Sequence, residues 1–140
     1  LEIVQEGIKQ GLVPQPSNAQ KASSICLCCD CCCQILKNLK KFEAPAKFIS
    51  SNFQAQVNQE ECTGCESCEE ICPMDAIAMD SDDGNTATVN LDRCIGCGLC
   101  VTVCEFDAVS LKDKEISERL TPPPNIVDMY TQIAQEKGLF

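Results

Sequence analysis

One segment of the sequence occurs twice, and this repeat limits the folds available to the chain more than any other feature. Residues 58–79 and 90–111 align at a constant offset of 32 residues, and each cysteine of one copy has a counterpart in the other. Other residues repeat at the same offset, namely Asn58 and Asn90, Gly64 and Gly96, and Asp75 and Asp107. Because a repeat this short cannot bury a core alone, we expect the two copies to pack about a pseudo-twofold axis.

The cysteines of each copy have the spacing C-x2-C-x2-C-x3-C, which is typical of bacterial iron-sulfur proteins. Three thiolates two residues apart can converge from one tight loop, whereas the fourth lies beyond, where the chain leads away. We therefore expect two [4Fe-4S] clusters with crossed ligands. The first set is Cys62, Cys65, Cys68 and Cys104, and the second is Cys94, Cys97, Cys100 and Cys72. Disulfides and zinc sites fit two tandem tetrads less well, since zinc usually takes C-x2-C pairs separated by a longer span.

At these residues the sequence resembles the dicluster bacterial-type ferredoxins, with all eight ligand positions present. One position departs from the pattern, because Glu105 follows Cys104 where proline is usual. The resemblance implies an α+β fold of short strands and helical turns, and low-potential electron transfer as the function. From the residue pattern we expect strands near 53–57, 77–79, 87–89 and 109–111, helical turns near 67–71 and 99–103, and a tight turn over 81–85.

A second group of cysteines precedes the repeat, with six cysteines in eight residues. They are Cys26, Cys28, Cys29, Cys31, Cys32 and Cys33. Cys26, Cys29 and Cys32 share the spacing of the repeat, so we favour a third iron-sulfur cluster with one of the other thiols as its fourth ligand. A thiol-disulfide redox role and a zinc site remain open. Adjacent cysteines cannot easily close a disulfide with each other, which weakens a purely structural role.

Residues 25–39, followed by 51–57 and the repeat, resemble the C-terminal half of larger multi-domain iron-sulfur proteins of anaerobes. This resemblance implies a missing N-terminal domain, and the start at Leu1 rather than Met also indicates a chain cut from something longer. Two alternatives to a simple carrier follow. The chain can be the electron-input part of an oxidoreductase, with chemistry at the Cys-rich site or on the missing domain. The Cys-rich stretch can also be a structural metal staple between two domains.

Charge and composition narrow the function further. The net charge is −10, with residues 1–57 at +2 and residues 58–140 at −12. Such an acidic half repels nucleic acid and anionic membranes and favours a redox partner with a basic docking patch. The absence of histidine excludes Rieske ligation and His-dependent catalysis. Fourteen cysteines in this arrangement indicate a reducing, cytoplasmic compartment, and we find no signal peptide and no spanning apolar run.

We expect four segments along the chain. Residues 1–24 form a helix and an extended linker, residues 25–50 the Cys-rich segment and a helix from Gln34 to about Ala44, residues 51–112 the dicluster domain, and residues 113–140 a proline-rich spacer and a helix. Asn125 should cap this last helix, whose apolar stripe includes Met129 and Tyr130. We expect that stripe to pack back on the protein.

Overall fold

The computed structural model describes residues 1–80 and 86–139, so the predicted turn at 81–85 lies outside the described residues. In chain order the elements are α1 (Glu2–Lys9), β1 (Val13–Pro16), β2 (Ile25–Cys28), α2 (Gln34–Leu39), the 3-10 helix η1 (Pro45–Phe48), β3 (Phe53–Val57), α3 (Ser67–Glu70), β4 (Ile77–Met79), β5 (Ala87–Val89), α4 (Leu99–Thr102), β6 (Val109–Asp113), the 3-10 helix η2 (Ile116–Glu118) and α5 (Ile126–Glu136). The protein is therefore a small mixed helix and strand structure.

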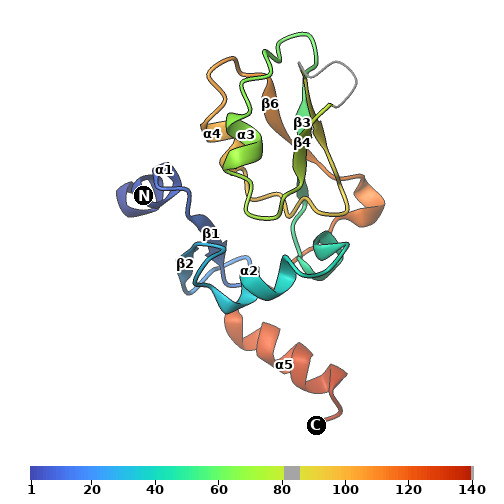
Figure 1. The fold of residues 1–140 in the computed structure, drawn as a ribbon. Helices are drawn as coiled ribbons and strands as arrows, with labels where there is room; N and C mark the ends of the chain where they lie inside the picture. Colours follow the sequence, from blue (N-terminus) through green and yellow to red (C-terminus); the bar gives the residue numbers. More distant parts are fainter. Residues whose placement is uncertain (81–85, 140) are drawn as a thin grey trace.

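The repeat folds into two short antiparallel sheets with two helical turns beside them (Figure 1). Strand β3 pairs with β6, with Ala55 opposite Leu111, and β4 pairs with β5, with Ala78 opposite Thr88. The strands predicted near 53–57, 77–79, 87–89 and 109–111 and the two helical turns are confirmed. Strand β3 precedes the first group of cysteines and pairs with β6, which follows the second group. Strand β4 follows the first group and pairs with β5, which precedes the second group.

Equivalent backbone contacts recur at the offset of 32 residues. The Asn58 N–H donates to Ala108 O, and the Asn90 N–H donates to Ala76 O, both at 2.7 Å. Each bond therefore runs from one copy of the repeat to the other. The left-handed backbone of Asp75 (φ 50°) also matches that of Asp107 (φ 53°). The two copies are interlocked through these equivalent hydrogen bonds.

The segment that the sequence predicts as an extended linker, residues 12–24, instead contributes a strand. Strands β1 and β2 form a two-stranded antiparallel ribbon in which Gln15 lies opposite Cys26. The prolines of β1 lack a backbone donor, but a strand with a free edge tolerates proline there, so the composition misled this prediction. Helix α1 packs on the ribbon with Gly7 against Leu27, whose Cδ1 would lie 2.7 Å from a Cβ placed on the glycine. The six-cysteine stretch therefore begins in a strand.

Helix α2 ends at Leu39, earlier than predicted, and the residues after it are fastened to the repeat. The Arg93 guanidinium donates to three carbonyl oxygens, those of Met74 (2.7 Å), Phe42 (3.0 Å) and Lys40 (3.3 Å). The Lys40 ammonium lies 2.9 Å from an Asp75 carboxylate oxygen. These contacts hold the end of α2 against the turn that follows Cys72.

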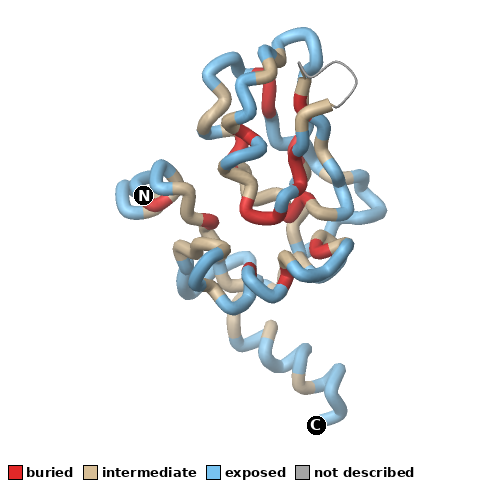
Figure 2. The backbone as a smooth tube through the Cα atoms, viewed as in Figure 1, coloured by how far each residue is buried: buried red, intermediate tan, exposed pale blue. Residues whose placement is uncertain are grey.

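The buried residues form one cluster that runs from the β-ribbon and α2 into the repeat. Val13, Leu36 and Leu39 belong to it together with Ala55 and Leu99 of the repeat. Most of the buried chain in Figure 2 lies within the two sheets and their helical turns, whereas α5 has only exposed and intermediate residues. The N-terminal segment therefore shares a core with the repeat.

Helix α5 begins as predicted, since the Asn125 side chain accepts hydrogen bonds from the N–H groups of Val127 (2.9 Å) and Asp128 (3.0 Å). The prediction that α5 packs back on the protein is wrong. Tyr130 is 64% exposed, none of the helix residues is buried, and the helix extends away from the rest of the chain in Figure 1. Amphipathic spacing showed that a helix forms but could not show what covers it. No helix within residues 1–80 and 86–139 combines the length and apolar character that crossing a bilayer requires.

Candidate metal centres

The first predicted set of four thiols surrounds one cavity. Three of the thiols come from the loop before α3 and from α3 itself, namely Cys62, Cys65 and Cys68. The fourth, Cys104, follows α4 in the second copy. The cavity together with its open mouth measures about 310 Å³, and its other walls include Met79, Ala87, Phe106 and Ala108. Four thiols around a largely apolar cavity are what a [4Fe-4S] cluster needs as its ligands.

The second predicted set surrounds a second cavity, which together with its open mouth measures about 350 Å³. Cys94, Cys97 and Cys100 come from the loop before α4 and from α4, and Cys72 comes from the first copy. Ile77, Ile95 and Leu99 contribute buried apolar walls. Each cavity therefore has three thiols from one copy and one from the other, as the crossed arrangement requires.

Backbone N–H groups point at three of these sulfurs. The Ala55 N–H donates to Cys94 Sγ and the Ala87 N–H to Cys62 Sγ, both at 3.4 Å. These two bonds are equivalent, since donors and acceptors are each 32 residues apart, and each bond crosses between the copies. The Ala76 N–H donates to Cys72 Sγ at 3.2 Å. Such donors stabilise negative charge on sulfur and help to set the reduction potential of a bound cluster.

Residues 44–108 match the family model described as "4Fe-4S dicluster domain". The chain contains a dicluster ferredoxin-type domain. The resemblance inferred from the repeat is thus confirmed, and the two-cluster count fits this domain. Among curated proteins, no sequence matches the chain significantly.

The two quartets of the dicluster domain differ in exposure. In the first, Cys65 is exposed, and the N–H of Ser67 lowers its pKa, whereas burial raises the pKa of Cys68. In the second, burial raises the pKa of Cys97 to about 11 and that of Cys100 to about 12. Buried thiols ionise poorly unless a cation compensates the charge, so loading the second cavity must be coupled to proton release.

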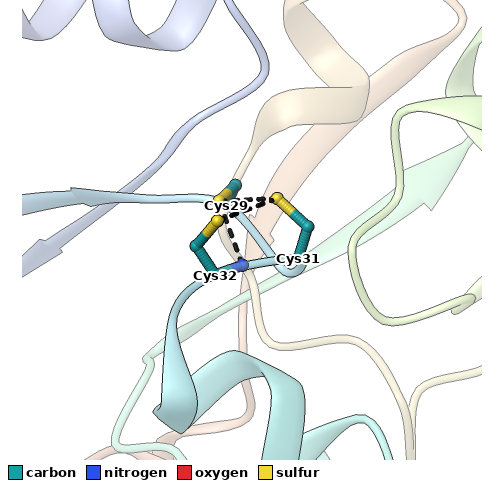
Figure 3. Close-up of side chains that lie close together, drawn as sticks. All are labelled: Cys29, Cys31 and Cys32. Carbon is teal, nitrogen blue, oxygen red and sulfur yellow. Dashed lines mark hydrogen bonds between the residues drawn. The ribbon is translucent and has the colours of Figure 1, made fainter.

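Three thiols of the six-cysteine stretch lie close enough together to share one ion, and they are not the three that the two-residue spacing picks out. The sulfurs of three cysteines, Cys29, Cys31 and Cys32, all lie within 4.8 Å of one another (Figure 3). Cys26 does not belong to this group. The Cys31 thiol donates to Cys29 Sγ at 2.9 Å, and the Cys32 N–H donates to the same sulfur at 3.3 Å. We call these three residues the thiol trio. Cys26 lies in β2, which begins at Ile25.

Hydrogen bonding shifts the pKa values of two thiols of the trio in opposite directions. The Cys31 thiol and the Cys32 N–H lower the pKa of Cys29 to about 7, and the same bond raises the pKa of Cys31 to about 11. Nearby, burial and a hydrogen bond with Cys33 raise the pKa of Cys28 to about 11, whereas the N–H of Leu36 lowers the pKa of Cys33. The stretch therefore contains thiols that ionise easily beside thiols that resist ionisation.

Sequence reasoning found every cysteine but missed the groups that position them. The side chains of Ala55 and Ala87 do not mark these residues as part of a site, since each contributes only a backbone N–H. Their equivalence within the repeat is the one signal that could have identified them. Arg93 reads as an ordinary surface cation, and its three carbonyl partners are known only once α2 has been placed.

Proposed function

We propose that the chain is a low-potential electron-transfer protein or module that works through two [4Fe-4S] clusters and carries a third metal centre within Cys26–Cys33. The observation that carries the proposal is the pair of cavities, each lined by four thiols from both copies of the repeat. Bound [4Fe-4S] clusters supply one-electron redox chemistry at potentials tuned by their surroundings. The chain supplies ligands, N–H donors and apolar walls.

We assign the ligands in two crossed sets. Cys62, Cys65, Cys68 and Cys104 hold the first cluster, and Cys94, Cys97, Cys100 and Cys72 hold the second. A pseudo-twofold axis relating the two copies accounts for this crossing, and the paired bonds of Asn58 and Asn90 and of Ala55 and Ala87 support it. Thiol ligands that must stay reduced favour a reducing cytoplasm, and the wider resemblance of residues 25–57 favours an anaerobe.

Charge around the first quartet indicates where a partner docks. Cys65 is exposed, and carboxylates on the same loop and helix, including Glu66, Glu69 and Glu70, are exposed as well. A partner with a basic patch would be steered to this end of the domain, where a ligand sulfur reaches the surface. We therefore infer that electrons leave or enter at the first quartet.

Electron transfer from the reduced protein to a basic redox protein tests the proposal. Reversal of charge in the Glu69→Lys, Glu70→Lys double variant should lower the second-order rate at least tenfold at low salt, and the difference should shrink as salt is added. Glu136→Lys, on the far α5 helix, is the matched control and should change the rate little. Equal rates for the two variants would refute docking at the first quartet, and no electron transfer at all would refute the function.

A second candidate function is the electron-input part of an oxidoreductase, and one observation favours it. An open groove of about 1420 Å³, including its mouth, runs between the ribbon residues 13–19 and the loop of the second quartet, where it reaches Ile95 and Cys97. A substrate or an attached domain seated there would lie beside a cluster ligand. Substrate-dependent turnover by the isolated chain would support this candidate, whereas reversible reduction without turnover supports the carrier.

A further inference from the structure

The thiol trio differs in size from both quartets of the dicluster domain. Within residues 1–80 and 86–139, it is the group whose three ligand atoms all lie within 4.8 Å of one another. Thiolates that bind one ion through bonds of about 2.3 Å in tetrahedral geometry have their sulfurs about 3.8 Å apart. Thiolates of a cubane bind different irons and must stand further apart. The sulfurs of the trio in Figure 3 are closer than this, with 2.9 Å between Cys29 and Cys31 and 3.5 Å between Cys31 and Cys32. Binding one ion therefore needs them to move apart by about 1 Å or less, whereas a cubane needs a wider separation.

The backbone holds the trio in place from both sides. Strand β2 leads into it from the ribbon, and α2 leaves it after Cys33, whose N–H donates to Cys29 O at 3.1 Å. Asp30, inside the trio, has its carboxylate 3.3 Å from the Lys40 ammonium. Lys40 also pairs with Asp75, so the loop is linked to the turn after Cys72. A metal here would be fixed relative to the second quartet.

We propose that Cys29, Cys31 and Cys32 bind one thiophilic ion of the Zn²⁺ class, with its fourth position facing solvent. Cys31 and Cys32 are exposed and Cys29 is half-buried, so water or an external thiol can reach the ion. Three protein ligands with an accessible fourth position are typical of reactive zinc sites, whereas structural sites use four. The inference rests on the third metal centre of the proposed function and replaces a third cubane by a single ion.

Metal analysis of anaerobically purified, dialysed full-length protein tests the proposal. We expect about one zinc per chain beside about eight iron and eight sulfide ions. The Cys29→Ser, Cys31→Ser, Cys32→Ser triple variant should lose the zinc and keep the iron, and Cys26→Ser, outside the trio, should keep both. About twelve iron and sulfide ions, with loss of about four in Cys26→Ser, would overturn the proposal in favour of a third cubane.

A titration of the wild-type holoprotein with Co²⁺ keeps the test independent of variant folding. One equivalent should bind and give the intense charge-transfer absorption of a thiolate complex, and Zn²⁺ should displace it. Failure to bind, with two thiols of the stretch lost to oxidation, would overturn the metal site in favour of a disulfide. Failure of the electron-transfer function would appear separately, as zinc binding by a chain whose dicluster domain cannot be reduced.

Discussion

Replacing Gly96 by alanine should weaken the second cluster selectively, because this glycine lies between Ile95 and Cys97 in the loop of the second quartet. Its φ is +66°, and a Cβ built on it would lie 2.2 Å from the Phe53 carbonyl oxygen and 2.6 Å from Ser51 Oγ. The left-handed backbone costs an alanine about 1–2 kcal/mol, and reduced freedom of the unfolded chain returns about 0.4–1 kcal/mol. Relieving the overlap with β3 adds about 1–3 kcal/mol. We therefore expect Gly96→Ala to destabilise the protein by about 1–5 kcal/mol.

Gly138→Ala is the matched control, since Gly138 has nearly the same φ, +65°, and nothing within 4 Å of the added methyl. It should cost no more than about 1.6 kcal/mol and leave both clusters bound. The assay is denaturant-induced loss of the visible cluster absorption under anaerobic conditions, together with iron per chain. Gly96→Ala should lose about half of its iron first, because the overlap is local to one quartet. Identical stability and iron content in the two variants would refute the reasoning from backbone overlap.

Three further outcomes follow from the same contacts. If ligation is crossed, the single variant Cys104→Ser and the double variant Cys104→Ser with Cys65→Ser should have the same iron content, about four per chain. The double variant Cys104→Ser with Cys97→Ser should lose nearly all of its iron. The reverse pattern would contradict the ligand sets. Arg93→Met should cost about 1.5–3 kcal/mol, the contribution of one hydrogen bond from a charged donor, because only the bond to Met74 O is both short and half-buried. The variant should also speed proteolysis of the segment after α2, and unchanged cleavage would contradict this role. In metal-stripped protein the alkylation rate of Cys29 should be half-maximal at a pH of about 7 and level off about two pH units higher, because the rate follows the thiolate of a group with a pKa of about 7. A half-maximal rate near the usual thiol pKa of about 8.5 would contradict this.

The repeat could be read from the sequence because its information is local. Cysteine spacing, a constant offset and short alternating runs are enough to place strands such as Phe53–Val57 and Ile77–Met79 and to suggest which thiols share a cavity. The offset also relates backbone groups that no side chain marks in the sequence, such as the N–H of Ala55, which donates to Cys94 Sγ. Such groups are identified only once the two copies have been placed against each other.

The N-terminal segment could not be read in this way, because its structure depends on distant pairing. Pro14 and Pro16 indicate a linker by composition, but an edge strand accepts proline. The pairing of this strand with β2 then places the start of the six-cysteine stretch in a ribbon. The trio of Cys29, Cys31 and Cys32 departs from the two-residue spacing, and Cys26 lies in β2. Spacing identifies candidate ligands, and the fold selects among them.

Reductive titration of the anaerobically purified protein, followed by electron paramagnetic resonance, tests the central claim most directly. Two [4Fe-4S] clusters held in the crossed quartets should accept about two electrons per chain, reversibly, and the reduced centres should show magnetic interaction because the quartets share the interlocked repeat. A chain that accepts no electrons, or about one electron with half of the expected iron, would contradict the account.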